Sequence, residues 1–190
     1  MLAINLRPAL ELTNEEFEQI CRSNPELRLE RNAQGELIAM SAAGSESSRR
    51  NADILIDLGL WNRQTQLGIT FDSSAGFTLP NGAIRSPDAS WIAKDRWNAL
   101  PPEQRRRFAP ICPDFVVELK SPSDTWEDLQ KKMVEYLDNG AQLGWLIDPD
   151  SRKAEVYRAG EPATPLQNPA TLSGEAVLPE FVLNLEVVWG

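Results

Sequence analysis

Hydrophobic residues recur at helical spacing in two stretches near the start of the chain. The segment Thr13-Asn14-Glu15-Glu16 is a capping-box signature before an apolar face, and it predicts a helix over about residues 13–23. Residues 27–31 and 36–40 flank a turn sequence and are typical of a hairpin. After a loop of small residues at 41–45, a longer helix is expected from about Glu46 to Gln66, where apolar side chains share one face: Ile54, Leu58 and Trp61.

After Gly68 the pattern changes to short apolar runs separated by turn residues. A short helix is expected around 103–107, and a longer one runs from Ser121–Asp124 to Asn139-Gly140. Residues 159–172 are rich in proline and read as an exposed connector, and 177–189 supply closing strands. The other expected strands are 69–72, 76–79, 88–93, 114–120, 143–148 and 154–158.

This order of elements predicts an α/β fold with one mixed central sheet flanked by helices. The segment 114–148 is expected to form a right-handed parallel crossover, which would place a ligand near the carboxyl ends of the central strands. No domain boundary is visible, so the 190 residues are expected to form a single domain. Its expected parts are an N-terminal helix and hairpin at 1–40, a core at 41–158, and the connector with closing strands at 159–190.

Composition restricts the chemistry. The chain has no histidine, which excludes Ser-His-Asp and Cys-His catalysis and every histidine metal site. Any metal is therefore a hard ion held by oxygens, such as magnesium, calcium or manganese. The net charge of -9 argues against a large nonspecific nucleic-acid surface, but it allows a local basic groove and fits clustered carboxylates that collect a metal.

The cysteines and the hydropathy profile point to the cytoplasm. Cys21 and Cys112 lack CxxC spacing and fall in apolar patterns, which favours reduced thiols over a disulfide or a zinc site. No apolar run approaches the ~18–20 residues that a membrane span needs. Residues 1–11 lack the basic start and apolar stretch of a signal peptide.

The most informative stretch is the apolar strand that contains Glu118 and Lys120. Side chains two positions apart share one face of a strand, roughly 6.6 Å apart, so these two are expected to project together. Burying an acid and an amine in an apolar strand is costly without compensation, which a metal ion and a polar substrate would provide. Asp88 begins the preceding strand candidate, and two carboxylates from neighbouring strands beside a lysine form a candidate hard-metal site.

This combination resembles the PD-(D/E)XK nuclease superfamily. The fuller pattern is similar to its Uma-type branch, a prokaryotic family of restriction-endonuclease-like proteins, and it spans most of the chain. The resemblance is carried by Met40-Ser41, Gly44-Ser45-Glu46, Leu79-Pro80-Asn81-Gly82, Arg85-Ser86-Pro87-Asp88, the run from Pro113 to Asp124, Lys132 to Tyr136, and Gly144 to Pro149. It implies a restriction-endonuclease-like fold, a mixed central sheet flanked by helices with extra N- and C-terminal strands.

The resemblance also implies roles for the site residues. Asp88 and Glu118 would bind a divalent cation, Mg²⁺ or Mn²⁺, with the backbone carbonyl of Leu119 as a further oxygen ligand. Lys120 would orient or help to deprotonate the attacking water and stabilise charge on the phosphate. Glu46 would complete the metal shell directly or through water. A cation held in this way polarises the phosphoryl oxygen and lowers the pKa of bound water.

Lys132 and Tyr136 lie one helical turn apart. They are expected to face the same pocket and contact a phosphate or a carboxylate next to the metal ligands. The alternative is an ordinary amphipathic-helix pair.

Plain structural readings of the other residues stay open at this point. Asp88 also fits a strand start after a proline turn. The acid and the lysine of the apolar strand also fit a partly exposed ion pair. Glu46 also fits an acid favoured by the dipole in the first turn of a helix.

The leading hypothesis from the sequence is a Mg²⁺-dependent endonuclease that hydrolyses DNA. A homodimer is expected because cutting both strands of a duplex needs two sites. The alternative is a nuclease-fold protein without useful catalysis that acts as a binding or interaction module. A nuclease for RNA or branched DNA is a third possibility, since no base-reading element is recognisable.

Overall fold

The structure is a computed structural model that describes residues 2–7, 10–40 and 44–190. Most of the small-residue loop expected at 41–45, with Ser41 of the Met40-Ser41 pattern, lies outside these residues. The elements are β1 (Leu2–Ile4), α1 (Asn14–Ser23), β2 (Arg28–Arg31), β3 (Leu37–Met40), α2 (Ser45–Thr65), β4 (Gly68–Asp72), β5 (Phe77–Thr78), β6 (Ile84–Arg85), β7 (Ala89–Ala93), α3 (Lys94–Ala99), α4 (Pro102–Arg105), β8 (Phe115–Leu119), α5 (Trp126–Asp138), β9 (Leu143–Asp148), β10 (Lys153–Arg158), β11 (Thr164–Gln167), β12 (Thr171–Ser173), β13 (Val182–Asn184) and α6 (Glu186–Trp189).

A six-stranded mixed sheet forms the centre, in the order β11-β10-β9-β8-β7-β4. The crossover through α5 is parallel, as expected: β8 pairs with β9 in a register that sets Leu119 opposite Ile147. On its other side β8 pairs antiparallel with β7, with Ala89 opposite Val117. The C-terminal end of β8 and the N-terminal end of β7 therefore lie side by side at the same end of the central strands.

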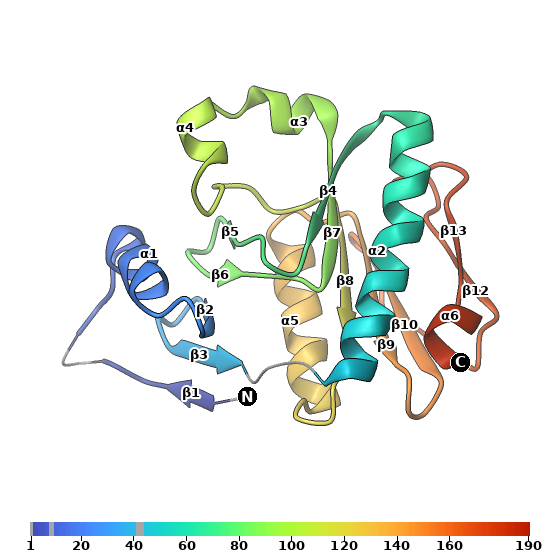
Figure 1. Cartoon of the computed structure of the whole chain (residues 1–190), viewed down its shortest axis with the longest axis horizontal. Helices are drawn as coiled ribbons and strands as arrows, with labels where there is room; N and C mark the ends of the chain where they lie inside the picture. The colour runs from blue at the N-terminus through green and yellow to red at the C-terminus, as the bar shows by residue number, and fades with distance from the viewer. Residues whose placement is uncertain (1, 8–9, 41–43) are drawn as a thin grey trace.

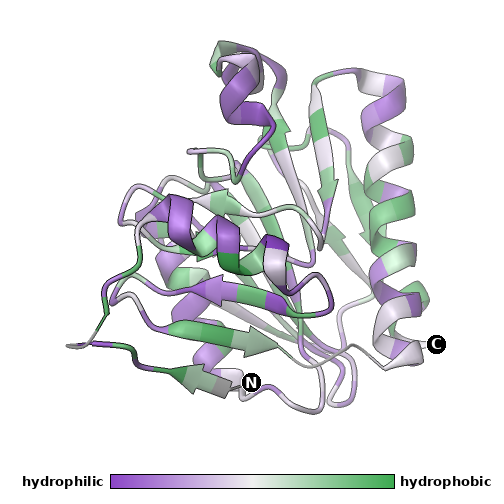
Figure 2. Ribbon diagram, turned by 60° about the vertical axis from the view of Figure 1, so that its left-hand side comes forward, coloured by the Kyte–Doolittle hydropathy of each residue, from purple (hydrophilic) through white to green (hydrophobic). Residues whose placement is uncertain are grey.

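Helices α2 and α5 cover opposite faces of this sheet (Figure 1). Alternate residues of β8 point to opposite faces. Phe115 and Val117 join the cluster that contains Leu58 of α2, whereas Val116 joins the cluster that contains Met133 of α5. In Figure 2 the hydrophobic residues run along the central strands, and the helices alternate between the two colours because each buries one side.

A second sheet, in the order β1-β3-β2-β6-β5, lies beside the first. The expected hairpin forms, as β2 and β3 pair antiparallel, and α1 begins at the expected capping box, in which the Thr13 hydroxyl accepts a hydrogen bond from the Glu16 N–H at 3.2 Å. The expected mixed central sheet is confirmed, and β5 and β6, around the Pro80-Asn81-Gly82 turn, pair with the hairpin in the second sheet.

The C-terminal part also differs from expectation. Residues 159–172, expected to be a connector, contain β11 and the start of β12, and the closing segment contains β13 and the short helix α6. These strands have mostly exposed side chains, so they lack the apolar alternation that would reveal them. No helix in the described part of the chain is both long and apolar enough to cross a membrane.

Candidate active site

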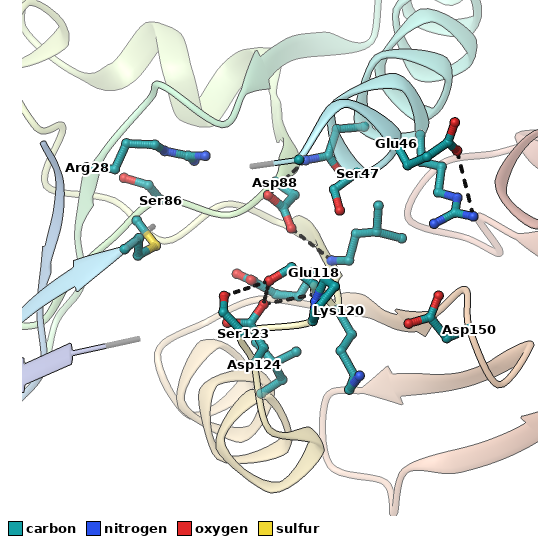
Figure 3. Close-up of a pocket in the computed structure, with 18 of the residues that line it drawn as sticks. Arg28, Glu46, Ser47, Ser86, Asp88, Glu118, Lys120, Ser123, Asp124 and Asp150 are labelled. Atoms are coloured by element: carbon teal, nitrogen blue, oxygen red, sulfur yellow. Dashed lines mark hydrogen bonds and ion pairs between the residues drawn. The ribbon is translucent and has the colours of Figure 1, made fainter. Parts of the chain in front are cut away.

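A pocket of about 700 Å³ opens at the C-terminal end of the central strand β8 (Figure 3). Its wall is built by Arg28 of β2, the first turns of α2, Asp88 before β7, residues 118–124, and Lys132 of α5. Segments that are far apart in the sequence thus meet at the carboxyl end of a central strand, the position expected for a ligand in this class of sheet.

Asp88 is half-buried and is held by two donors. Its Oδ2 accepts a hydrogen bond from the Leu119 N–H at 2.9 Å, and its Oδ1 accepts one from Nδ2 of Asn51 at 3.1 Å. Burial raises the pKa of Asp88, although the Leu119 N–H and the charge of Lys132 oppose the rise. The carboxylate is therefore fixed in place and costly to keep charged without a cation nearby.

Glu118 projects from β8 toward α5 and is 4 % exposed. Burial raises its pKa to about 7, and the nearby carboxylates of Asp88 and Glu30 add to the rise while Lys132 opposes it. Burial outweighs Lys132, whose ammonium is shared between Glu118 and Glu30. Two acidic groups that disfavour each other's charge thus border one pocket, which is typical of a cation site.

Lys132 and Tyr136 both contact Glu118 from α5. The Nζ of Lys132 lies 2.8 Å from Oε1 of Glu118, and the hydroxyl of Tyr136 donates to the same oxygen at 2.9 Å. Burial would lower the pKa of Lys132, but Glu118 and Glu30 outweigh it and raise the pKa, so the ammonium stays charged. Both side chains are buried and contact Glu118, and Lys132 also lines the pocket, whereas their role toward a phosphate stays a prediction.

Lys120 lines the pocket, but its ammonium does not lie beside the two acids. Its Nζ is 3.8 Å from Oδ2 of Asp148, and in Figure 3 its side chain extends away from Asp88. Glu118 and Lys120 line the same pocket, and the Lys120 N–H continues the β8–β9 ladder by donating to the Ile147 carbonyl at 2.8 Å, but the two side chains, both in the described part of the chain, form no ion pair with each other. The parallel register brings Lys120 next to the last residue of β9. The ammonium that accompanies Glu118 is that of Lys132.

Glu46 borders the same pocket from the first turn of α2. It is exposed, and its carboxylate forms ion pairs with Arg49 at 3.3 Å and Arg50 at 3.9 Å. Across the described residues, no three histidine, cysteine or acidic side chains gather as a metal-binding group. The structure thus brings Asp88, Glu118 and Glu46 to one pocket without gathering the three carboxylates into a metal-binding group, and the role of Glu46 as a ligand stays a prediction.

Comparison with known proteins assigns the family. The model of the family Uma2, described as "Putative restriction endonuclease", matches residues 14–186. The chain belongs to the Uma2 family. A crystal structure described as "a putative nuclease belonging to DUF820 from Anabaena variabilis ATCC 29413" shares its fold, with a TM-score of 0.78 and 21 % sequence identity over 94 % of this chain and 97 % of that one. No curated protein matches the chain.

The donor set of this Uma2 protein fits a hard divalent cation. Asp88 and Glu118 supply carboxylate oxygens, and Oδ1 of Asn51 is buried without a hydrogen-bond partner among the described residues. An unpaired buried carbonyl oxygen is costly, and a cation is one way to satisfy it. All three residues line the same pocket and offer oxygen donors of the kind that Mg²⁺ and Mn²⁺ prefer.

Cationic side chains gather around these acids in the Uma2 pocket, although the chain carries a net charge of -9. The Nε of Arg50 is buried and has no hydrogen-bond partner in the described part of the chain. A guanidinium group with an unused donor is suited to a phosphate oxygen. The cationic residues that line the pocket are Arg28, Arg50, Lys120 and Lys132.

Two contributors to the Uma2 site are absent from the sequence-based list. Asn51 lies five residues beyond Glu46 on α2, and the periodicity of the helix gave no sign that its side chain reaches Asp88. Glu30 lies on β2, where Leu29, Glu30 and Arg31 are all buried, so no alternation separates an inward face. The strand reads Arg-Leu-Glu-Arg, so nothing in its sequence singles out Glu30.

Proposed function

We propose that this protein is a metal-dependent endonuclease that hydrolyses DNA. The observation that carries the proposal is that Asp88 and Glu118, from two neighbouring strands, border one pocket that also collects four cationic side chains. Two acids suit a divalent cation, and the cationic side chains suit the phosphates on either side of the bond to be cut. Membership of Uma2 and the restriction-endonuclease-like fold support the same activity.

Asp88 and Glu118 would hold Mg²⁺ or Mn²⁺, with the Leu119 carbonyl and Oδ1 of Asn51 as further oxygen ligands. Glu46 would complete the metal shell directly or through water. When bound, the cation supplies charge stabilisation at the phosphoryl oxygen and a more acidic water. The chain's own residues position the rest: the Leu119 N–H and Asn51 fix the Asp88 carboxylate, and Tyr136 fixes Glu118.

The proposed role of Lys120 requires its ammonium to move from Asp148 to a phosphate of the substrate. Its ammonium contacts Asp148 at 3.8 Å, beyond hydrogen-bond distance, and its side chain is 19 % exposed to the pocket side of the molecule. A weak, partly exposed ion pair contributes little to stability, so a phosphate anion can compete for the ammonium. Lys120 would then stabilise charge on the phosphate and orient the attacking water, while Lys132 remains bound to Glu118.

The proposal predicts metal-dependent cleavage that requires Lys120. The purified chain is expected to cut plasmid DNA with Mg²⁺ or Mn²⁺ and not with excess chelator. Lys120→Ala is expected to lose at least about 100-fold in cleavage rate while keeping its circular dichroism spectrum, because it removes charge stabilisation worth roughly 3 kcal/mol. Lys131→Ala is the matched control, since Lys131 is exposed on α5 and pairs only with Asp128 among the described residues. Robust cleavage by Lys120→Ala would remove its catalytic role.

A second candidate function rests on the same ammonium groups. Glu118 is already paired with Lys132, and Lys120 is turned toward Asp148, an arrangement that also suits a nuclease-fold protein that binds nucleic acid or a protein partner without cutting. Absence of cleavage with either metal on DNA, RNA and branched DNA, together with retained binding of one of them, would favour this function.

A homodimer is part of the proposal, because a duplex break needs two active sites. Light scattering of the purified chain at micromolar concentration is expected to give about twice the 21.2 kDa of one chain. A strict monomer that still makes double-strand breaks would contradict this expectation.

A further inference from the structure

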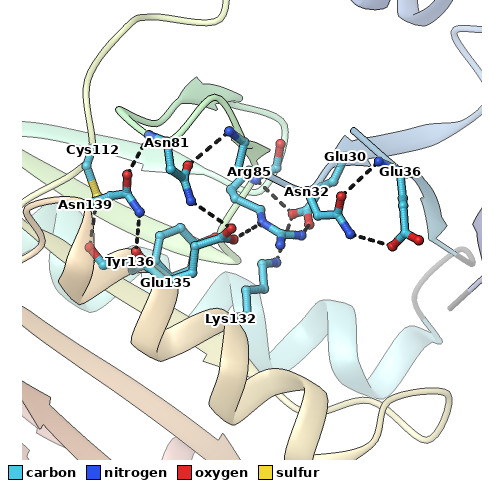
Figure 4. A network of polar contacts seen from close by, with 12 residues as sticks. Glu30, Asn32, Glu36, Asn81, Arg85, Cys112, Lys132, Glu135, Tyr136 and Asn139 are labelled. Carbon is cyan, nitrogen blue, oxygen red and sulfur yellow. Dashed lines mark hydrogen bonds and ion pairs between the residues drawn. The ribbon is translucent and has the colours of Figure 1, made fainter. Parts of the chain in front are cut away.

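Glu30 lies at the centre of a buried polar network that joins the N-terminal hairpin to the pocket (Figure 4). It is 1 % exposed, and both of its carboxylate oxygens are used. Oε1 accepts hydrogen bonds from Nζ of Lys132 at 2.8 Å and from the N–H of Ser86 at 2.9 Å, and Oε2 accepts one from Arg85 at 3.0 Å. A residue of β2 therefore contacts two segments that the sequence places 55 and 102 positions away.

Through these contacts Glu30 reaches both acids of the proposed cation site. The Lys132 ammonium that it binds also lies 2.8 Å from Glu118. The Ser86 N–H that it binds is two residues before Asp88, and Pro87 between them has a restricted backbone. One carboxylate thus holds the partner of Glu118 and the backbone that leads into Asp88.

The charges in this network are matched closely. Lys132 is shared by Glu30 and Glu118, and Arg85 is shared by Glu30 and Glu135, whose Oε2 lies 2.6 Å from Nε of Arg85. If the charge of Glu30 were removed, the ammonium of Lys132 would face Glu118 alone. It would then compete more strongly with any divalent cation for that carboxylate, because opposite charges in a buried site attract strongly.

We propose that Glu30 is a positioning residue for the cation site: it holds Lys132 and the backbone at Ser86 so that Glu118 and Asp88 are both available to one divalent cation. The inference rests on the proposed function. It makes the N-terminal hairpin a working part of the site rather than a decoration of the core.

The test compares Glu30→Gln with Glu135→Gln in the full chain, with Mn²⁺ binding measured by calorimetry. Both variants remove the charge of an acid that pairs with Arg85, so both are expected to lose stability. Of these two acids, Glu30 is the one that pairs with Lys132. Glu30→Gln is therefore expected to weaken Mn²⁺ binding by about 10- to 100-fold, whereas Glu135→Gln stays within about threefold of the wild type.

Glu30→Asp serves if Glu30→Gln does not fold. It keeps the charge but withdraws the carboxylate by one methylene, so it is expected to weaken Mn²⁺ binding by about three- to tenfold. Wild-type binding of Mn²⁺ together with unchanged affinity in the folded Glu30 variants would overturn this inference alone. Absence of Mn²⁺ binding by the wild type would overturn the proposed function and the inference with it.

Discussion

Replacement of Lys132 by methionine is expected to lower the free energy of unfolding by about 3–5 kcal/mol, because it leaves two buried carboxylates without their shared cation. Lys132 is 8 % exposed and contacts Glu30 and Glu118, each at 2.8 Å. Methionine fills a similar volume, so the loss reports the charge rather than a cavity. Urea denaturation of both proteins measures it.

The loss is expected to depend on pH in a definite direction. Without Lys132 the pKa of Glu118, already raised by burial from its ordinary 4.5 to about 7, rises further in the folded state. At any pH between the pKa of Glu118 in the unfolded chain and its raised pKa in the folded protein, the folded protein keeps a proton that the unfolded chain has released. Stability therefore falls as the pH rises through this window. The cost of Lys132→Met is therefore smaller near about pH 5 than near about pH 8.

Lys131→Met provides the control for this experiment. Lys131 is the preceding residue of α5, its side chain is 76 % exposed, and it forms a surface ion pair with Asp128 at 3.1 Å. The same substitution there is expected to change stability by less than about 1 kcal/mol at either pH. Equal losses for the two variants would show that the buried network is not what Lys132 contributes.

Replacement of Asp88 by asparagine is expected to reduce metal-dependent DNA cleavage by at least about 10³-fold. The amide keeps the shape but removes one of the two negative charges proposed to hold the cation, and a loss of roughly 4 kcal/mol of charge stabilisation corresponds to that factor. Initial rates of plasmid cleavage with Mn²⁺, compared at equal protein concentration, measure the effect.

Asp88→Asn is expected to lose cleavage activity without losing folding stability. Burial raises the pKa of Asp88, so its charge is unfavourable in the protein without a cation. Asparagine relieves that cost. When the Asn51 amide turns over, the new NH2 group can donate to Oδ1 of Asn51 while the remaining oxygen still accepts from the Leu119 N–H. The variant is expected to be unchanged or more stable by about 0–1 kcal/mol. A large loss of stability would instead mean that Asp88 is a structural strand-start residue.

Asp150→Asn is the matched control for activity. Asp150 also lines the pocket but is exposed in the turn after β9. Its replacement is expected to leave cleavage within about threefold of the wild type, since an exposed carboxylate there interacts weakly through water. Wild-type cleavage by Asp88→Asn would remove Asp88 from the proposed site.

Local patterns along the sequence determined most elements of the central fold. Apolar spacing predicted α2 and β8, and capping chemistry predicted α1 at Thr13, because these signals depend on neighbours within one or two turns. The same reasoning placed Asp88 and Glu118 on adjacent strands and Lys132 on the helix between β8 and β9. Exposed strands such as β11 escaped prediction because nothing in their pattern distinguishes a solvated edge from a loop.

The sequence by itself determined which residues carry the candidate chemistry: two acids at strand ends, lysines near them and no histidine. Only the tertiary structure decided which ammonium meets which carboxylate. Lys120 lies next to Asp148 because of the parallel register of β8 and β9, and Lys132 lies between Glu118 and Glu30 because the hairpin packs beside α5. Charge pairing in a buried site depends on a few ångströms of three-dimensional placement, and no pattern of neighbours in the chain encodes a contact across 102 residues.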